Sequence, residues 1–328
     1  MPGAGKELSW QAGSENEKDR DMRIAVVGVG GVGGYFGARL KAAGESVAFL
    51  ARGAHLAAMR RDGLKIKSAH GDLRIHPIEA TDDARAIGPV DVAIVAVKLY
   101  DTEAAAESCR ALLGPNTAVV SLQNGVTAAD TLAAAVGAER VLGGIAYIMA
   151  TIAEPGVIAH TGTMARLVLG EFGGGGSARI SALAAAIRRA GVEVEESPDI
   201  AAAIWTKFVF LAPLSGITSL TRSTVGPIRT DPGARGLFAN AIAETVAVAR
   251  ARQIRVAPDA AERALAFLDG LPADMGSSML YDLSHGKRLE LSWLSGTVAR
   301  LGREAGIATP THDFIVAALG LYAAGGRN

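Results

Sequence analysis

Short apolar runs separated by helical segments make up the first part of the chain. Four short segments, at residues 23–28, 46–50, 91–97 and 117–121, each contain a continuous apolar run, and a helix is expected at residues 35–43. A strand that is apolar on both faces belongs to a sheet that is covered on both sides. The pattern therefore predicts a parallel α/β sheet.

Strand signals continue past residue 140 and stop at Pro198. Further strands are expected at residues 140–149, 156–161, 166–169 and 192–194, with a helix at residues 179–190. The later segments all have helical patterns, at residues 199–215, 231–252, 260–269, 278–285, 290–305 and 311–324. The predicted fold class is α/β, with an N-terminal Rossmann-type parallel sheet domain at residues 22–198 and an all-helical C-terminal domain at residues 199–328.

The charge balance narrows the range of partners. Lys plus Arg number 33 and Asp plus Glu number 33, so the formal net charge is zero. Binding to nucleic acid or to a membrane surface calls for a basic excess, so we expect neither partner. Pro213 interrupts the most apolar stretch, and no run of about 18 apolar residues is found. We expect a soluble, cytoplasmic protein.

Other chemistries are excluded by what the chain lacks. Residues 1–21 are polar and have no apolar centre of the signal-peptide kind, so we interpret them as a disordered leader. The single cysteine, Cys109, excludes an internal disulfide and a cysteine-built metal site. None of the six histidines has the spacing of a metal motif, so no metal is expected.

Glycine is enriched, with 40 residues, and one cluster has the form of a dinucleotide-binding fingerprint. The cluster follows a predicted strand and opens a helix, as that fingerprint requires. Gly28 allows the tight turn, Gly30 lets the backbone approach a pyrophosphate, and Gly33 lets the helix pack against the strand. The residues expected to bind the cofactor here are Gly28, Gly30, Gly31, Val32 and Gly33. A purely structural glycine turn is the alternative.

The end of the second strand selects the cofactor. An NAD site usually has Asp or Glu there, whereas this strand ends in Phe49-Leu50-Ala51-Arg52. A guanidinium suits a 2′-phosphate, so Arg52 favours NADP(H) over NAD(H). The alternative for Arg52 is a solvated loop charge.

Two further residues follow predicted strands. Lys98 comes after the run ending at Val97, and Asn124 comes after the next strand. The carboxyl ends of parallel strands form the ligand edge of an α/β sheet. Asn124 is therefore a candidate for holding the nicotinamide or a reacting carbonyl, although either residue could equally be an ordinary loop residue.

Several motifs occur in order along residues 23–320. They are the glycine turn, Leu50-Ala51-Arg52-Gly53, Val97-Lys98, Gln123-Asn124-Gly125, Trp205-Thr206-Lys207, Ser278-Met279-Leu280-Tyr281-Asp282, Glu290, Gly296 and Gly306-Ile307-Ala308-Thr309-Pro310. In this order they resemble the ketopantoate reductases (2-dehydropantoate 2-reductases). The resemblance implies NADPH-dependent reduction of a 2-oxo acid to a 2-hydroxy acid, in the pantothenate pathway.

The resemblance also implies roles for individual residues. The glycines would bind the pyrophosphate and Arg52 the 2′-phosphate, and Lys98 and Asn124 would hold the inner part of the cofactor and the substrate edge. Lys207 would be the general acid, Ser278 would bind the substrate carboxylate, and Glu290 would be an orienting partner. An ammonium stabilises the charge that a hydride leaves on a ketone oxygen, and then supplies the proton. From the residues alone, Lys207 could be a snorkelling lysine and Glu290 a solvated charge. The helical domain is the expected place for substrate binding and for a homodimer interface.

Three positions depart from the family pattern. Where the family usually has asparagines, this chain has Leu211, Ser215 and Ser295. We still expect Ser215 to contact the substrate. A site that pairs a substrate hydroxyl with an amide discriminates strongly, so losing the amide changes the preferred substrate. A paralogue that reduces a less hydroxylated 2-oxo acid is therefore an alternative.

Two other functions are open from the sequence. A non-catalytic NADPH sensor would need the Rossmann domain but neither Lys207 nor Glu290, so their presence favours an enzyme. A structurally related enzyme that reduces an imine, joining an amino acid to an oxo acid, would have the same two-domain layout.

Overall fold

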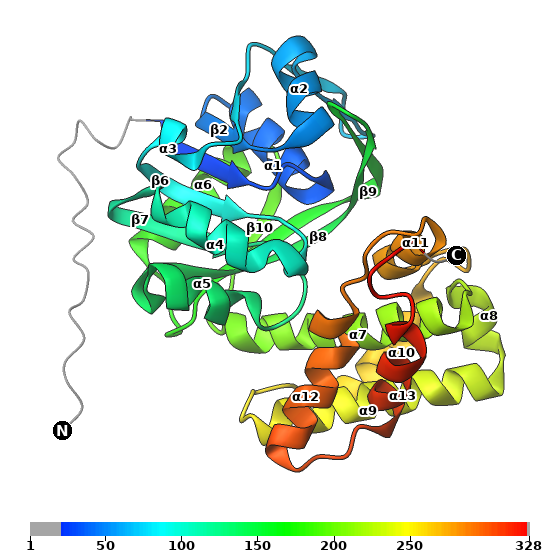
Figure 1. Cartoon of the computed structure of the whole chain (residues 1–328). Coiled ribbons are helices and arrows are strands. Elements are labelled where there is room, and N and C mark those ends of the chain that lie inside the picture. Colours follow the sequence, from blue (N-terminus) through cyan, green and yellow to red (C-terminus); the bar gives the residue numbers. More distant parts are fainter. Residues whose placement is uncertain (1–20, 327–328) are drawn as a thin grey trace, which may run out of the picture. The chain divides into compact units, whose positions relative to one another are not determined.

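The computed structural model describes residues 21–326, and these form two compact units, one up to Ile200 and one from Ala201 onward (Figure 1). The leader expected at residues 1–21 lies, apart from Asp21, outside the described residues. Each unit is described by itself.

A ten-stranded sheet forms the core of the first unit. Its order is β4-β3-β9-β8-β7-β6-β1-β2-β5, and β10 pairs with β9 outside this path. The strands are β1 (Arg23–Val27), β2 (Ser46–Leu50), β3 (Leu64–Lys67), β4 (Leu73–Ile75), β5 (Glu79–Thr81), β6 (Val90–Val95), β7 (Leu113–Ser121), β8 (Val141–Glu154), β9 (Val157–Glu171) and β10 (Glu193–Glu196). Pairing is parallel from β8 through to β5 and antiparallel in β8–β9 and β3–β4. The predicted α/β class is confirmed, with the antiparallel pairs as an addition.

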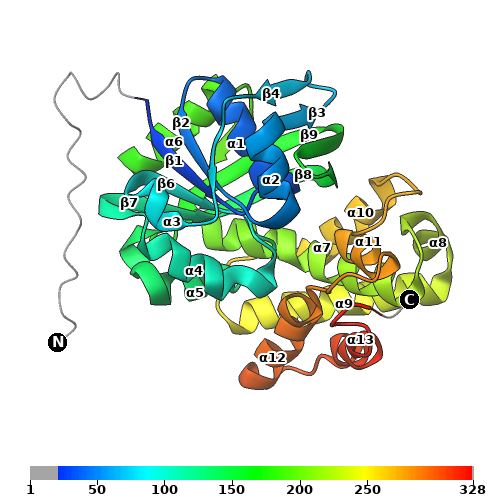
Figure 2. The ribbon, with the colours of Figure 1, turned by 45° about the horizontal axis from the view of Figure 1, so that its top comes forward.

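Helices cover both faces of this sheet. They are α1 (Gly31–Ala42), α2 (Gly53–Asp62), α3 (Ala84–Ile87), α4 (Thr102–Arg110), α5 (Ala128–Val136) and α6 (Ala178–Arg189), with short 3₁₀ turns η2 (Leu99–Asp101) and η3 (Ala138–Arg140). Ile24 and Val26 pack with α1 and α6, whereas Ala25 and Val27 pack with α4 and α5. Figure 2 shows α1 and α6 on one face of the sheet and α4 and α5 on the other. Alternate residues of β1 thus enter two separate cores, which is why the strand is apolar from Ile24 to Val27.

The expected strands at residues 156–161 and 166–169 are one strand, β9. Its pairing with β8 runs from Val157 to His160 and again from Ala165 to Glu171, so residues 161–164 form a bulge opposite Met149. Two imidazoles hold this bulge, because His70 Nε2 lies 2.7 Å from the Thr163 carbonyl oxygen and His160 Nε2 lies 3.0 Å from that of Met164. The break in the apolar pattern therefore marks a bulge within the strand.

The second unit is helical, as expected. Its elements are α7 (Ile200–Thr221), α8 (Val225–Thr230), α9 (Pro232–Ala251), α10 (Ala260–Gly270), α11 (Ser278–Ser284), the 3₁₀ turn η4 (Leu291–Trp293), α12 (Ser295–Ala305) and α13 (Pro310–Gly320). The helix expected at residues 290–305 is divided between η4 and α12. Helix α8, six residues long, was not predicted.

Helix α7 differs from the predicted helix at residues 199–215 in its end. It passes through Pro213, as that prediction implied, and ends at Thr221, six residues after the expected end. Buried residues on both sides of the proline, such as Ala212 and Ile217, are held by packing that outweighs the missing hydrogen bond. By length and mean hydropathy this helix could also cross a membrane, although polar residues such as Thr206, Lys207 and Ser215 interrupt its apolar positions. However, 56% of its most apolar window is buried, as in the core helix of a soluble protein.

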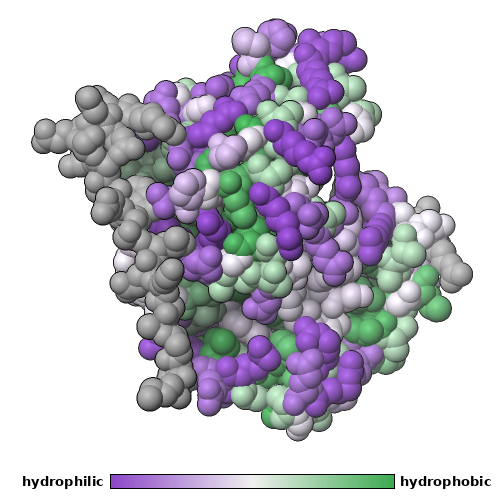
Figure 3. All heavy atoms as spheres, turned by 60° about the vertical axis from the view of Figure 1, so that its left-hand side comes forward, coloured by the Kyte–Doolittle hydropathy of each residue, from purple (hydrophilic) through white to green (hydrophobic). Residues whose placement is uncertain are grey.

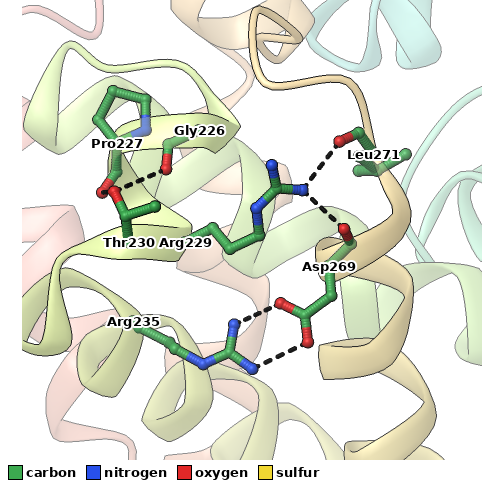
Figure 4. A network of polar contacts seen from close by, with 7 residues as sticks. All are labelled: Gly226, Pro227, Arg229, Thr230, Arg235, Asp269 and Leu271. Atoms are coloured by element: carbon green, nitrogen blue, oxygen red, sulfur yellow. Dashed lines mark hydrogen bonds and ion pairs between the residues drawn. The ribbon is translucent and has the colours of Figure 1, made fainter.

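An ionic network joins α8, α9 and α10. Arg235 on α9 binds both carboxylate oxygens of Asp269 on α10, at 2.6 and 3.0 Å (Figure 4). Arg229 on α8 donates to the backbone oxygens of Asp269 and Leu271, at 2.7 and 3.0 Å. These bonds satisfy carbonyls at the end of α10, which have no partner within the helix.

Hydrophilic and hydrophobic residues are interspersed on the face drawn in Figure 3. Large exposed apolar side chains in the described chain include Met149, Met164, Phe267, Phe314 and Leu321. Exposed apolar residues are ordinary on soluble proteins and do not by themselves identify a partner. The homodimer therefore stays a prediction.

Candidate cofactor and substrate site

The glycine turn joins β1 to α1 as the fingerprint predicts. Gly28 has a φ of +95°, and a Cβ there would lie 2.5 Å from Val97 Cγ1. Its N–H donates to the Leu50 carbonyl at 3.1 Å. Only glycine fits this conformation and this close approach to the loop after β6.

The next glycines have different surroundings. A Cβ at Gly33 would lie 2.1 Å from the Gly28 carbonyl oxygen, so Gly33 serves the close packing of helix and turn. A Cβ at Gly31 would lie 1.9 Å from the Ala150 carbonyl oxygen on β8, so this glycine has a packing reason that the sequence did not reveal. Gly37, one turn on, is packed against Phe49 in the same way.

Gly30 is the exception among these glycines. It is the N-cap of α1 with a φ of −79°, which any residue adopts, and a Cβ there would have no atom of the described chain within 4 Å. No feature of the folded chain requires glycine at this position. The first turn of α1 has no acidic side chain, so none neutralises the positive end of the helix dipole, which favours an anion.

The residues predicted after four strands lie at one edge of the sheet. Val27 of β1 is paired with Leu50 of β2 and with Val95 of β6, and Val95 is paired with Ser121 of β7. Gly28, Arg52, Lys98 and Asn124 each follow one of these paired positions within three residues. The structure therefore brings them together at the carboxyl edge, where α/β sheets bind ligands.

Arg52 already has an ionic partner at this edge. Its Nη2 lies 2.5 Å from Oδ2 of Asp101, in the turn after β6. The arginine side chain is 77% exposed and the aspartate side chain 25% exposed. Asp101 is a residue that the sequence reasoning missed, because nothing local indicates that these two loops meet.

Two other residues order this edge and were given no role. The Gln123 amide donates to Thr102 Oγ1 at 2.8 Å, which ties the loop carrying Asn124 to the start of α4. His55 Nδ1 accepts the Gly156 N–H at 3.0 Å, and burial lowers the pKa of His55 while the Val29 backbone opposes that shift. His55 thus contacts both the glycine turn and the β8–β9 turn as a neutral imidazole.

The predicted general acid lies in the second unit. Lys207 is on the second turn of α7, next to the buried Trp205 and Phe208, and is itself half-buried. Burial lowers the pKa of Lys207 to about 8. An ammonium whose pKa lies near neutral pH gives up its proton readily, as a general acid must.

The serines that were singled out gather along α7. Thr218 Oγ1 on α7 lies 2.7 Å from Oγ of Ser277, which caps α11 by accepting the Leu280 N–H. Ser278 is the next residue, and it is exposed. A Cβ on Gly216 would lie 2.9 Å from Ser295 Oγ, so the start of α12 packs directly on α7.

Two of these hydroxyls are unusual. Ser215 and Ser295 are fully buried, and neither hydroxyl has a hydrogen-bond partner within residues 21–326. Glu290, at the start of η4, is also buried, with 5% exposed. A buried carboxylate stays charged only when it is paired. The contact of Ser277 with Thr218, and that of Ser295 with Gly216, place Ser278 and Ser295 two to three turns beyond Lys207 along α7.

In comparison with known proteins, both units match models of one protein family. The family model for ketopantoate reductase PanE/ApbA matches residues 24–174, and the model for its C-terminal part matches residues 199–323. The chain is 32% identical to the oxidoreductase YkpB of Bacillus subtilis, over 92% of this chain and 99% of that one. It is also 32% identical to a 2-dehydropantoate 2-reductase of Mesorhizobium japonicum, over 90% and 96%.

A solved structure has the same fold. The crystal structure of a 2-dehydropantoate 2-reductase from Geobacter metallireducens superposes with a TM-score of 0.85 at 33% identity. The match covers 92% of this chain and 99% of that one. Both units therefore take part in the similarity.

Proposed function

Because the chain belongs to the ketopantoate reductase family, we propose that this oxidoreductase uses NADPH to reduce 2-dehydropantoate to pantoate, in pantothenate biosynthesis. The observation that carries the proposal is the open space over Gly30, at the N-terminus of α1. The folded chain gives no reason for glycine there, whereas a pyrophosphate seated on the helix N–H groups does.

The carboxyl edge of the sheet fits the rest of the cofactor. Arg52 would bind the 2′-phosphate, and Lys98 and Asn124 would hold its inner part. When bound, the nicotinamide supplies a hydride to the carbonyl carbon. The carbonyl oxygen then becomes an alkoxide, and a proton from Lys207 Nζ converts it to the hydroxyl.

The remaining residues position the substrate. Ser278, exposed at the start of α11, would donate to the substrate carboxylate, and the buried Glu290 would orient Lys207 and keep it charged. Ser215 would contact the substrate from α7. The enzyme is proposed to be soluble and cytoplasmic, and to form a homodimer through its helical unit.

A second candidate is a paralogue that reduces a different 2-oxo acid. The buried hydroxyls of Ser215 and Ser295, and the apolar Leu211, stand where the family resemblance implies amides. A shorter hydroxyl and a leucine suit a substrate with fewer hydroxyl groups.

The experiment is a panel of 2-oxo acids assayed by NADPH oxidation, with ketopantoate first and NADH as the control cofactor. Vigorous turnover of ketopantoate supports the proposal and rules out the paralogue. Turnover only of another oxo acid supports the paralogue. Turnover only after an amine is added indicates imine reduction, and cofactor binding without any turnover indicates a sensor.

A further inference from the structure

The ion pair between Arg52 and Asp101 crosses the glycine turn. Arg52 follows β2 and Asp101 follows β6, and these two strands flank β1 on either side in the sheet. The pair therefore joins the two loops above the carboxyl end of β1, where Gly28 begins the turn.

Several contacts fix the aspartate more firmly than the arginine. The Asp101 N–H donates to the Lys98 carbonyl at 2.9 Å, and Thr102 Oγ1 donates to the Leu99 carbonyl at 2.7 Å, so η2 is a closed turn. The Asp101 side chain is three-quarters buried, whereas the Arg52 side chain is 77% exposed. The carboxylate is thus the more buried partner of the pair, and the guanidinium is the more exposed one.

The negative charge of Asp101 affects the binding of NADP(H) and of NAD(H) differently. A 2′-phosphate must take the Arg52 guanidinium from Asp101 or share it at close range, and in either case two anions compete for one cation. A 2′-hydroxyl carries no charge, and it can donate a hydrogen bond to a carboxylate. Asp101 therefore opposes the phosphate that Arg52 attracts.

We propose that Asp101 is a specificity-determining residue that weakens the preference for NADP(H) over NAD(H) by holding Arg52 in an ion pair. This inference rests on the proposed function, because it takes Arg52 as the residue beside the adenosine ribose. Asp101 acts through Arg52, and it has no part in the proposed chemical step.

Titration calorimetry of the full chain with NADP⁺ and with NAD⁺ tests the proposal. Asp101→Asn keeps the shape of the side chain and removes its charge, and because the Asp101 side chain makes no capping bond to α4, the fold should survive. We expect the variant to bind NADP⁺ roughly threefold to tenfold more tightly, with NAD⁺ binding unchanged or weaker. The matched control is Asp62→Asn, which removes the surface partner of Arg61 at the C-terminal end of α2 and should change neither constant.

The outcomes separate this inference from the proposed function. NADP⁺ binding that is unchanged or weaker in Asp101→Asn overturns the inference alone, since the cofactor still binds. Equal tightening of both nucleotides also overturns it, because the charge would then act without regard to the 2′-phosphate. Binding of neither nucleotide to the unaltered protein overturns both the inference and the proposed function.

Discussion

Gly30 and Gly31 are adjacent residues with opposite reasons for being glycine. Nothing in the described chain lies near a Cβ on Gly30, whereas a Cβ on Gly31 would run into the Ala150 carbonyl. A sequence motif cannot separate them, because Ala150 is far away along the chain. The distinction between a glycine kept for a ligand and one kept for packing comes only from the fold.

Replacing Gly30 by alanine should therefore have a different effect from replacing Gly31. We expect Gly30→Ala to fold with unchanged stability and to bind NADPH at least about tenfold more weakly, a loss of about 1.4 kcal/mol. Gly31→Ala should be destabilised by about 1–3 kcal/mol through overpacking. Urea unfolding and fluorescence titration with NADPH measure the two effects. A destabilised Gly30→Ala that binds normally would contradict the assignment.

Lys207 is the residue on which the proposed chemistry depends. Lys207→Ala should lower kcat by roughly 10²–10⁴-fold, because the alkoxide loses its proton donor. The Kd for NADPH should stay the same, since the cofactor binds to the first unit. Single-turnover rates and cofactor titrations on one preparation provide both values. Intact turnover in this variant would rule out Lys207 as the acid.

The lowered pKa of Lys207 also predicts a pH dependence. Burial lowers this pKa to about 8, so the ammonium is present below pH 8 and is lost as the pH rises through that value. We expect kcat/KM for reduction to fall about fivefold from pH 8 to pH 9, and about tenfold per pH unit above pH 9. Lys207→Arg stays protonated and should lack this alkaline limb, even if its rate is low. A wild-type profile that is flat to pH 10 would exclude this role.

At the scale of elements, two adjacent serines at the start of α11 have different expected roles, one in stability and one in substrate binding. Ser277 is buried, caps the helix and bonds to Thr218, whereas Ser278 is exposed. Ser277→Ala should cost about 1–2 kcal/mol of unfolding free energy. Ser278→Ala should leave stability unchanged and raise KM for the oxo acid. Denaturation and steady-state kinetics on both variants test this pair, and it fails if the two serines exchange effects.

The pattern of the chain predicted the central strands and missed the outer ones for a physical reason. Strands β1 and β2 lie between other strands and helices, so nearly every residue is apolar and the signal is strong. Strands β3, β4 and β5 have three or four residues with exposed positions, so their patterns are weak. Tertiary packing also extends α7 six residues past its expected end at Ser215, which a local rule cannot anticipate.

The candidate site was predictable where it follows from strand ends. In a parallel sheet the carboxyl ends meet at one edge, so Arg52, Lys98 and Asn124 could be placed from the sequence. Their partners could not, because Asp101 meets Arg52, and Gln123 meets Thr102, only once separate loops have folded together.

At the scale of the whole molecule, the proposed cofactor site lies in one of the two compact units. NADPH binds the first unit in our proposal, so it should stabilise the unfolding transition of that unit directly. At 100 times Kd the gain is about 2.7 kcal/mol. Calorimetric scans with and without NADPH measure it, with Gly30→Ala as the control. An equal gain in Gly30→Ala would show that the cofactor binds elsewhere.

The bulge in β9 determines where in this strand residues can be inserted or deleted. Residues 157–159 are held by β3 and residues 166–169 by β10, so each end of the strand has a neighbour that sets its register. Residues 161–164 take no part in either pairing. Insertions or deletions in this stretch leave both ladders aligned, whereas the same change a few residues away would turn buried side chains outward.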